Sequence, residues 1–416
     1  MRRCRLWNPA SESVACRNQA TDVNIVILAP CPVPLTIGGA EKLWWGLLNY
    51  LNAETHHHAD MIKLPGPERD FWEVVDSYRR FSDLNLRYYD LVVSGKYPAW
   101  MADHPNQVCY MLHPLRGLYD AYPRHWPPRC EVRHPDVRRL VGLLRGGDHS
   151  REALFECFAR VERLAAPRRP RRLRHPVPKE AFAFPGPLIR EIVQFCDRVA
   201  FRPGAIRRFG AISATVAGRD GYFPAGTDVA AVHPPSGLTG FRPPRRGRYL
   251  FTVGRLDPPK RVDLLISAMQ SVPANVELWI AGTGPDDARL RELASADARI
   301  RFLGFVNDTA LLDLYAGALA VLFAPLHEDF GLVALEAMSA GKPVITTRDA
   351  GGAQELVQHG RTGYVVDPRP ESIAAAVEKL VRRRGLARRM GLRGRELTQQ
   401  VSWDRVCSTL LEGLEP

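Results

Sequence analysis

The chain has 416 residues, more than the size at which a single hydrophobic core keeps growing, so we expect two domains. Its contents of 45% hydrophobic and 25% charged residues exclude a disordered or fibrous protein. A formal net charge of +12 favours an anionic partner, such as a nucleic acid, an acidic membrane surface or a phosphorylated substrate.

The eight cysteines show no Cys-x-x-Cys spacing and no neighbouring pair of histidines. Their placement predicts neither a zinc site nor a disulfide framework, and it fits a reduced cytoplasmic compartment. No stretch of the sequence reaches the roughly 18 apolar residues that a membrane-spanning helix requires. We therefore expect a cytoplasmic protein, and we leave open peripheral contact with the inner face of the membrane through its basic surface.

The first expected domain covers residues 22–240 and follows a loose tail over residues 1–21. It begins with an apolar run at 23–29, which has the length typical of a buried parallel strand. The alternation of strands and helices that follows predicts a parallel α/β sheet. The next expected elements, in chain order, are a helix at 40–51 and strands at 90–94 and 107–112.

Residues 123–178 form an expected insertion, rich in arginine and proline, with one helix at 151–164. Its densest charge run comprises Arg168, Arg169, Arg171, Arg172 and Arg174. We interpret this run as solvated surface, and contact with a membrane or an acceptor is the alternative. Regular alternation resumes with a helix at 188–201. The stretch 233–247 then predicts a linker, because proline cannot continue a central strand or helix.

The second expected domain covers residues 241–400 and alternates strands with helices throughout. Strands are expected at 249–253, 276–281, 299–303, 320–324 and 343–347, and helices at 262–271, 288–293, 309–316, 331–340 and 371–383. This order predicts a doubly wound parallel sheet, whose ligands bind beyond the carboxyl ends of the strands. A final segment, 401–416, contains a last expected helix at 404–414.

The strongest functional signal is a pair of glutamates, Glu328 and Glu336, separated by seven residues across a strand-to-helix junction. The helix is expected to begin near Gly331 and to present free backbone N–H groups and a partial positive charge above the sheet. Glu328 would then lie at the mouth of the sheet, with Glu336 further along the helix. Carboxylates at two depths can each accept hydrogen bonds from sugar hydroxyl groups.

This stretch resembles the retaining glycosyltransferases of family 4, the glycogen synthase-like members of the GT-B superfamily. The resemblance extends from residue 23 to about residue 395 and is strongest over 249–367. It implies two Rossmann-like, doubly wound domains facing across a cleft, with the acceptor held by the first and the nucleotide sugar by the second. It also implies that the helix at 404–414 packs back on the first domain.

By the same resemblance, Glu328 contacts the transferred sugar and Glu336 contacts the ribose hydroxyls. Four following residues would turn their backbone toward the sugar and the phosphates: Phe330, Gly331, Leu332 and Val333. We expect all six to bind the donor.

Two cations, Arg255 and Lys260, follow the first strand of the second domain at the functional edge of the sheet. They match the diphosphate-binding cations of the family, and an ordinary surface ion-pair residue is the alternative for Arg255. One charge pair about 4 Å apart at an effective dielectric of 20 is worth roughly 4 kcal/mol before desolvation. Two cations and a helix N-terminus are therefore expected to stabilise a leaving diphosphate. The neighbouring Arg261 is interpreted as a solvated helix charge.

Small residues at other strand ends complete the expected donor site. Gly38 and Gly39 follow the first strand, where the family has a loop that touches the diphosphate and the acceptor; a plain turn is the alternative. Gly282 and Val306 follow two later strands, at the height where the nucleobase of the family lies. The chain does not match Gly-x-Gly-x-x-Gly after its first strand, so an NAD site is not predicted.

His113 comes directly after the strand at 107–112. A neutral imidazole there can exchange a proton or bond a sugar hydroxyl, and its placement is similar to that of the active-site histidine of several family members. A packed loop histidine is the alternative. The cluster His56, His57 and His58 is interpreted as a loop.

Asp-x-Asp, which other transferases use to hold a divalent cation, is absent from the sequence. We therefore expect no metal and no other cofactor, because cationic side chains and a helix terminus can stabilise the diphosphate. The arginine run lacks interleaved stacking aromatics, so we expect no nucleic-acid partner. The expected partners are a nucleotide-sugar donor and a saccharide or glycolipid acceptor.

These features together predict a retaining, metal-independent hexosyltransferase that uses a UDP- or GDP-sugar in polysaccharide or glycolipid assembly. The expected catalytic residues are His113, Arg255, Lys260 and Glu328. Two alternatives remain open: a sugar-nucleotide epimerase of the same two-domain shape, and a noncatalytic basic binding protein.

Overall fold

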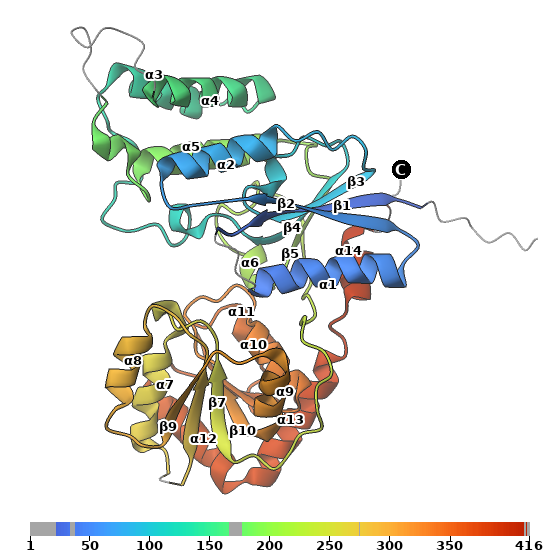
Figure 1. The fold of residues 1–416 in the computed structure, drawn as a ribbon, viewed down its shortest axis with the longest axis vertical. Coiled ribbons are helices and arrows are strands. Elements are labelled where there is room, and N and C mark those ends of the chain that lie inside the picture. The colour runs from blue at the N-terminus through green and yellow to red at the C-terminus, as the bar shows by residue number, and fades with distance from the viewer. Residues whose placement is uncertain (1–21, 34–37, 166–176, 274, 412, 414–416) are drawn as a thin grey trace, which may run out of the picture.

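The computed structural model describes residues 22–33, 38–165, 177–273, 275–411 and 413. Within them the chain forms two six-stranded sheets, which lie in two separate α/β halves of the molecule (Figure 1). The tail at 1–21 and the arginine run at 168–174 lie outside the described residues.

The first sheet has the strand order β2-β1-β3-β4-β5-β6, and its neighbouring strands are parallel. The central strand β1 is buried on both faces, with Val26 to Ala29 fully inaccessible, as expected for a parallel strand covered by helices. The strands are β1 (Asn24–Cys31), β2 (His58–Pro65), β3 (Leu91–Lys96), β4 (Gln107–His113), β5 (Arg208–Ala211) and β6 (Val229–Ala231).

Helices cover the first sheet on both sides (Figure 1). They are α1 (Gly39–Glu54), α2 (Phe71–Ser82), α5 (Pro187–Ala200) and the short α6 (Ala214–Ala217). Single 3-10 turns are η1 (Ala99–Met101), η2 (Arg116–Leu118) and η4 (Lys179–Phe182).

The insertion contains more structure than the sequence predicted. It forms two helices, α3 (Pro135–Arg145) and α4 (Arg151–Ala165), which pack on each other and on α5 as an outer layer (Figure 1). The expectation of a single helix was wrong, because α3 begins at a proline, Pro135. Proline is tolerated at the first helical position, where its missing N–H has no intrahelical partner, and the His134 side chain caps this start by accepting from the Asp136 N–H.

The loop prediction for the histidine cluster is confirmed for His56 and His57 and is wrong for His58. His58 opens strand β2 and lies opposite Asn24 of β1. β2 is an edge strand with mixed polar and apolar side chains, so its sequence lacks the continuous apolar run that identified the central strands.

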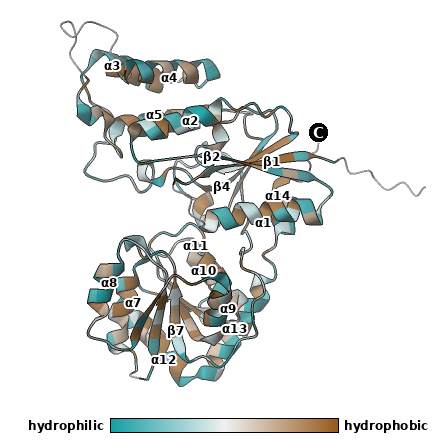
Figure 2. Cartoon of the chain, viewed as in Figure 1, coloured by the Kyte–Doolittle hydropathy of each residue, from teal (hydrophilic) through white to brown (hydrophobic). Residues whose placement is uncertain are grey.

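The second sheet has the order β12-β11-β10-β7-β8-β9, again with parallel neighbours. The strands are β7 (Tyr249–Val253), β8 (Glu277–Ala281), β9 (Ile300–Gly304), β10 (Ala318–Leu322), β11 (Val344–Thr347) and β12 (Gly363–Val366). The edge strand β12 was not predicted. In Figure 2 the strands around β7 are brown, whereas the outer helices carry teal faces.

The helices of the second half are α7 (Val262–Ala268), α8 (Asp287–Ala294), α9 (Asp308–Gly317), α10 (Leu332–Ser339), α11 (Gly352–Leu356), α12 (Pro370–Arg382) and α13 (Arg384–Thr398). Two 3-10 turns, η5 (Pro258–Lys260) and η6 (Met269–Ser271), flank α7. The last helix, α14 (Trp403–Leu411), contacts β4, β5 and α1 of the first half. None of the helices in the described ranges is long and apolar enough to cross a membrane.

Candidate functional site

The loop between β10 and α10 holds Glu328 by backbone pairing with the segment after β11. The Glu328 N–H donates to the Ala350 carbonyl at 3.1 Å, and the Glu328 carbonyl accepts from the Gly352 N–H at 2.8 Å. Gly351 has φ +68°, and a Cβ there would lie 2.3 Å from the Glu328 carbonyl oxygen. The position of Glu328 therefore depends on a residue without a side chain at 351.

Two predicted site residues from different strand ends meet directly. The Lys260 ammonium lies 2.6 Å from Oε2 of Glu328, and a quarter of each side chain is exposed. Lys260 ends η5 after β7, whereas Glu328 follows β10, which pairs with β7. The carboxyl edge of the second sheet thus presents a charge-assisted hydrogen bond that solvent and ligands can reach.

Arg255 lies in the same loop as Lys260 but extends into solvent. Its side chain is 72% exposed, and its Nε lies 3.6 Å from Asp257. The described interactions do not join it to Lys260 or Glu328. The structure therefore places Arg255 at the rim of the site, while Lys260 lies inside.

Arg261 is not the solvated helix charge that the sequence suggested. Its guanidinium is bidentate to Asp349, at 2.7 Å for each pair, and also donates to the carbonyls of Ala324 and Pro325 at 2.8 Å. The side-chain hydrogen bond from Arg261 lowers the pKa of Asp349. Arg261 thus ties the ends of β10 and β11 together and positions the loop that carries Glu328.

Glu336 lies in the second turn of α10 and is 8% exposed. Its Oε1 accepts a hydrogen bond from the Ser236 hydroxyl at 2.9 Å, and its Oε2 accepts one from the Tyr315 hydroxyl at 2.8 Å. Burial raises the pKa of Glu336, and the two hydroxyl donors partly oppose that rise. The structure places Glu336 deeper than Glu328, with no described contact between the two carboxylates.

The N-termini of two helices from opposite halves of the molecule face each other. α10 begins after Gly331, whose φ of +93° turns the chain into the helix. α1 begins at Gly39, where a Cβ would lie 3.5 Å from the Leu332 side chain. The first N–H groups of a helix have no intrahelical partner and carry partial positive charge. The α1 end is already capped by Glu41, whose carboxylate accepts from the Gly38 N–H at 3.0 Å. The α10 end, next to Glu328 in the chain, is therefore the one that attracts an anion.

The remaining predicted donor residues lie at the same sheet edge or next to it. Gly282 follows β8 and donates its N–H to the Gly304 carbonyl at 2.7 Å. Val306 is half-buried beyond β9, next to Phe305, which is 81% exposed. Phe330 is buried and stacks on the His233 ring at 5.2 Å.

His113 ends β4 and contributes a neutral imidazole. Burial, followed by the charge of Lys96, lowers the pKa of His113 to about 4. Its Nδ1 lies 2.9 Å from the Pro114 carbonyl, which can only accept. Nδ1 therefore carries the proton, and Nε2 is left as an acceptor.

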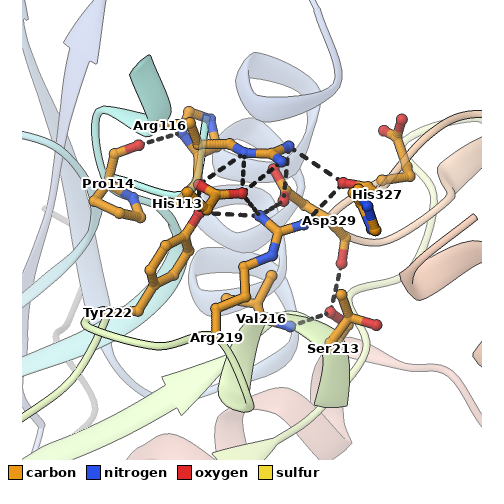
Figure 3. Close-up of polar contacts among 12 residues, drawn as sticks. His113, Pro114, Arg116, Ser213, Val216, Arg219, Tyr222, His327 and Asp329 are labelled. Carbon is orange, nitrogen blue, oxygen red and sulfur yellow. Dashed lines mark hydrogen bonds and ion pairs between the residues drawn. The ribbon is translucent and has the colours of Figure 1, made fainter. Parts of the chain in front are cut away.

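Sequence reasoning missed an ionic cluster that joins the two halves (Figure 3). Arg116 and Arg219 of the first half both pair with Asp329, the residue after Glu328. Both guanidiniums also donate to the His327 carbonyl, at 3.3 Å from Arg116 and 2.8 Å from Arg219. Burial raises the pKa of Asp329, and the charges of the two arginines oppose that rise.

The same cluster includes a second carboxylate in the first half. Asp120 accepts hydrogen bonds from Arg116 Nη2 and the Tyr222 hydroxyl, each at 2.7 Å. Burial alone would raise the pKa of Asp120, but these donors and the arginine charges lower it. The spacing of Arg116 and Asp120 by four residues was the one available sequence signal, and it gave no indication of the partner Asp329.

A carboxylate of the second half caps a helix of the first. Glu355 accepts from the N–H groups of Ala214 and Thr215 at the start of α6, at 2.9 and 2.5 Å. His233 lies 3.3 Å from the same carboxylate. Burial opposes ionisation of Glu355, but these hydrogen bonds prevail and lower its pKa.

The comparisons with known proteins first concern the second half of the chain. Residues 241–397 match the family model described as glycosyl transferases group 1. This part of the chain is a group 1 glycosyltransferase domain. The prediction of that group is confirmed, and the narrower assignment to family 4 stays a prediction. The matched residues of this glycosyltransferase domain include Arg255, Lys260, Glu328 and Glu336.

Curated relatives match the chain over part of their length. A GDP-mannose-dependent α-(1-6)-phosphatidylinositol monomannoside mannosyltransferase of Mycobacterium tuberculosis is 35% identical over 250 residues, which are 55% of this chain and 64% of the relative. An uncharacterised glycosyltransferase of Methanocaldococcus jannaschii is 34% identical over 166 residues, 38% of this chain and 42% of the relative. The chain therefore spans less than two thirds of the length of each of these two relatives.

Solved structures resemble the chain over most of its length. The Anabaena protein HepE, solved with UDP and glucose, has a TM-score of 0.58 at 16% identity, covering 93% of this chain and 98% of that one. Sucrose-phosphate synthase from Thermosynechococcus elongatus has a TM-score of 0.61 at 16% identity, covering 93% and 97%. These likenesses and the two parallel sheets confirm the predicted GT-B fold of two Rossmann-like domains.

Proposed function

We propose that this protein is a retaining glycosyltransferase that moves a hexose from a UDP- or GDP-sugar to an acceptor in polysaccharide or glycolipid assembly. The observation that carries the proposal is the Lys260 and Glu328 contact at 2.6 Å, beside the converging N-termini of α1 and α10. Cation, carboxylate and the N-terminus of α10 together fit a sugar joined to a diphosphate.

In this reaction the leaving group is the nucleoside diphosphate. Lys260 and the α10 N-terminus stabilise the negative charge that develops on it, and Arg255 approaches from the rim. Glu328 accepts hydrogen bonds from the transferred hexose, and Glu336 accepts them from the ribose in exchange for Ser236 or Tyr315. The acceptor oxygen bonds to the anomeric carbon on the face that the diphosphate leaves, while the bond from that carbon to the diphosphate oxygen breaks. The hydroxyl proton passes to the departing diphosphate, and the anomeric configuration is retained.

His113 is assigned a polar role on the acceptor side. With its pKa lowered to about 4, mainly by burial, the ring is neutral at pH 7 and its Nε2 accepts a hydrogen bond. A neutral acceptor at the end of β4 can orient a sugar hydroxyl without adding charge next to Lys96.

We propose that the transfer needs neither a divalent metal nor another cofactor. The support is the positive charge already present at the site, from Lys260, Arg255 and the N-terminus of α10. The expected acceptor, a saccharide or glycolipid, is supported by relatives such as the M. tuberculosis mannosyltransferase named above and a lipopolysaccharide core glycosyltransferase of Rhizobium meliloti. We further propose that the protein works in the cytoplasm, with peripheral contact to the membrane.

A thermal-shift screen with UDP- and GDP-sugars tests the donor assignment. We expect at least one of these sugars to raise the melting temperature, with the same result after addition of EDTA. NMR of the glycosylated product then reports the anomeric configuration, and transfer with inversion contradicts the retaining mechanism. Consumption of the donor without an acceptor, with release of an epimerised sugar, supports the epimerase alternative instead.

A further inference from the structure

A long groove runs along α5 in the first domain, outside the donor site. It consists of two adjoining cavities of about 830 and 680 Å³. Both cavities are lined by Arg190, Gln194 and Arg198, which follow one another at four-residue spacing and so lie on one face of α5. His149, which precedes α4, lines both cavities as well. We call this feature the α5 groove.

Within the described part of the chain, the hydrogen bonds of the two α5 arginines go to neutral acceptors, and the Arg190 guanidinium also lies 4.8 Å from the centre of the Tyr122 ring. Arg190 donates to the carbonyls of Leu118 and Pro128, at 3.0 and 2.9 Å. Arg198 donates to Nε2 of His149 and to the Leu144 carbonyl, each at 3.2 Å. A guanidinium has five N–H donors, so each arginine keeps three that these contacts do not use.

Two other cations of the groove have carboxylate partners. Arg202 lies 2.8 Å from Asp103, and Arg145 lies 2.7 Å from Glu191. Because these pairs are close to neutral, the positive charge of the groove comes from the two α5 arginines and from Arg129, an exposed cation that lines the smaller cavity.

None of the described carboxylates of the groove forms an ion pair with those arginines, although the charge of Arg198 partly opposes the rise that burial causes in the pKa of Asp197. Asp120 is held by the interdomain arginine cluster described above. Asp197 is buried below the groove, where it accepts hydrogen bonds from Trp100 and Tyr119. Asp220 is exposed at the rim of the larger cavity, with no described hydrogen bond or ion pair to either α5 arginine.

The α5 groove changes character along its length and leads toward the donor site. One end is apolar, lined by Phe201, Phe223 and Pro224. The other end reaches Tyr119 and Asp120. Asp120 contacts the same two arginines that bind the loop beside Glu328, so the groove and the donor site share one continuous set of contacts.

We propose that the α5 groove binds the acceptor through an oxyanion, a phosphate or a carboxylate, held by Arg190 and Arg198. Planar guanidinium groups with unused donors match the geometry of such anions. The apolar end then holds an uncharged part of the same acceptor. This inference rests on the proposed function, because it assigns the acceptor side of that reaction.

Calorimetric titration with glucose 6-phosphate, glucuronate and glucose tests the proposal, with excess UDP present to occupy the diphosphate site. The full chain is expected to bind at least one of the two anionic sugars and to show no detectable binding of glucose. The double variant Arg190→Gln, Arg198→Gln is expected to bind that anion at least tenfold more weakly. Arg87→Gln, which removes an exposed cation of the same domain away from the groove, is the matched control and should bind within twofold of the unchanged protein.

A second variant tests the same site independently, in case the double variant does not fold. Gln194→Glu keeps the size of the side chain and places a carboxylate between the two arginines, so it is also expected to weaken anion binding at least tenfold. Unchanged affinity in both variants, or an equal loss in Arg87→Gln, overturns the proposal.

Sedimentation with vesicles separates a lipid source of the anion from a soluble one. Binding to phosphatidylglycerol vesicles but not to phosphatidylcholine vesicles, lost in the double variant, supports an anionic lipid headgroup. Binding of glucose 6-phosphate alone supports a soluble phosphorylated glycan.

The same variants separate this proposal from the donor assignment. We expect the double variant to keep the thermal shift given by a UDP- or GDP-sugar, because both arginines lie outside the donor site. If no nucleotide sugar binds while the groove still binds anions, the proposed function fails, and the groove remains an anion site without an acceptor role. The opposite result overturns the groove assignment alone.

Discussion

The two sides of the interdomain site are built in different ways. On the second domain, Glu328 is placed by backbone pairing with residues 350–352 and by the Arg261 guanidinium. On the first domain, the contacts to the same loop come from side chains, namely the long Arg116 and Arg219 and the hydroxyl of Ser213, which donates to the Asp329 carbonyl. A backbone-held side keeps its shape when one side chain is replaced, whereas a side made of long side chains depends on each charge. Substitutions on the two sides should therefore have different signatures.

The largest expected effect is on chemistry and comes from the backbone-held side. Lys260→Gln removes the cation nearest the proposed diphosphate while the surrounding loop keeps its pairing. We expect kcat to fall about 10²- to 10³-fold, the effect of losing one donor that stabilises developing charge. Steady-state transfer assays measure this fall. Lys179→Gln, at an exposed lysine of the first domain, is the control, and an equal loss there contradicts the assignment.

The next largest effect is on the pH dependence of folding stability and comes from His113. Because burial lowers its pKa to about 4 from an ordinary 6.5, the unfolded chain binds more protons between these values. The contribution of His113 to stability is therefore full above pH 6.5 and is lost as the pH falls toward 4, by up to about 3 kcal/mol.

Urea unfolding between pH 4 and 7 tests this contribution by difference. The protein with His113→Gln should lose less stability on acidification than the unchanged chain. Asp197, whose pKa burial raises to about 6, titrates in both proteins and cancels in the difference. Parallel curves for the two proteins would show that His113 is not the neutral buried group described here.

A substitution of a glycine should disrupt the backbone-held side of the second domain itself. Gly351→Ala combines a positive φ with a Cβ only 2.3 Å from the Glu328 carbonyl, so we expect a loss of about 2 to 3 kcal/mol and displacement of Glu328. Gly360→Ala is the matched control, since its φ is +74° but its Cβ would meet no atom within 4 Å. It should lose about 1 kcal/mol and keep activity. If urea unfolding gives equal losses of stability for the two variants, the loss comes from backbone strain and not from the close approach of the Cβ to Glu328.

The smallest effect should come from the first-domain contacts. Asp329→Asn removes the charge that Arg116 and Arg219 share, and we expect the donor KM to rise about fivefold, or about 1 kcal/mol, with little change in melting temperature. Asp313→Asn is the control, because Asp313 also pairs with two arginines, each at 2.7 Å, outside the site. A rise in KM for both variants would indicate a general charge effect.

The sequence predicted best the strands and helices whose positions depend on residues close together in the chain. The apolar strands β7 and β10 and the start of α10 at Gly331 follow from local runs and turns, so their approximate places were expected. The edge strands β2 and β12 lack such runs because one side of each pairs with no strand. The role of Arg261 and the pairing of Asp329 with Arg116 depend on contacts between distant strand ends, which no local pattern encodes.

The return of α14 to the first domain gives the molecule two covalent connections between its halves, one through 232–248 and one through 399–402. Two bodies joined at two points can turn easily only about the line through both points. Opening and closing of the site should therefore be a hinge rotation about a fixed axis, without free tumbling of either half. Cutting the chain before Trp403 would leave a single tether and remove that axis.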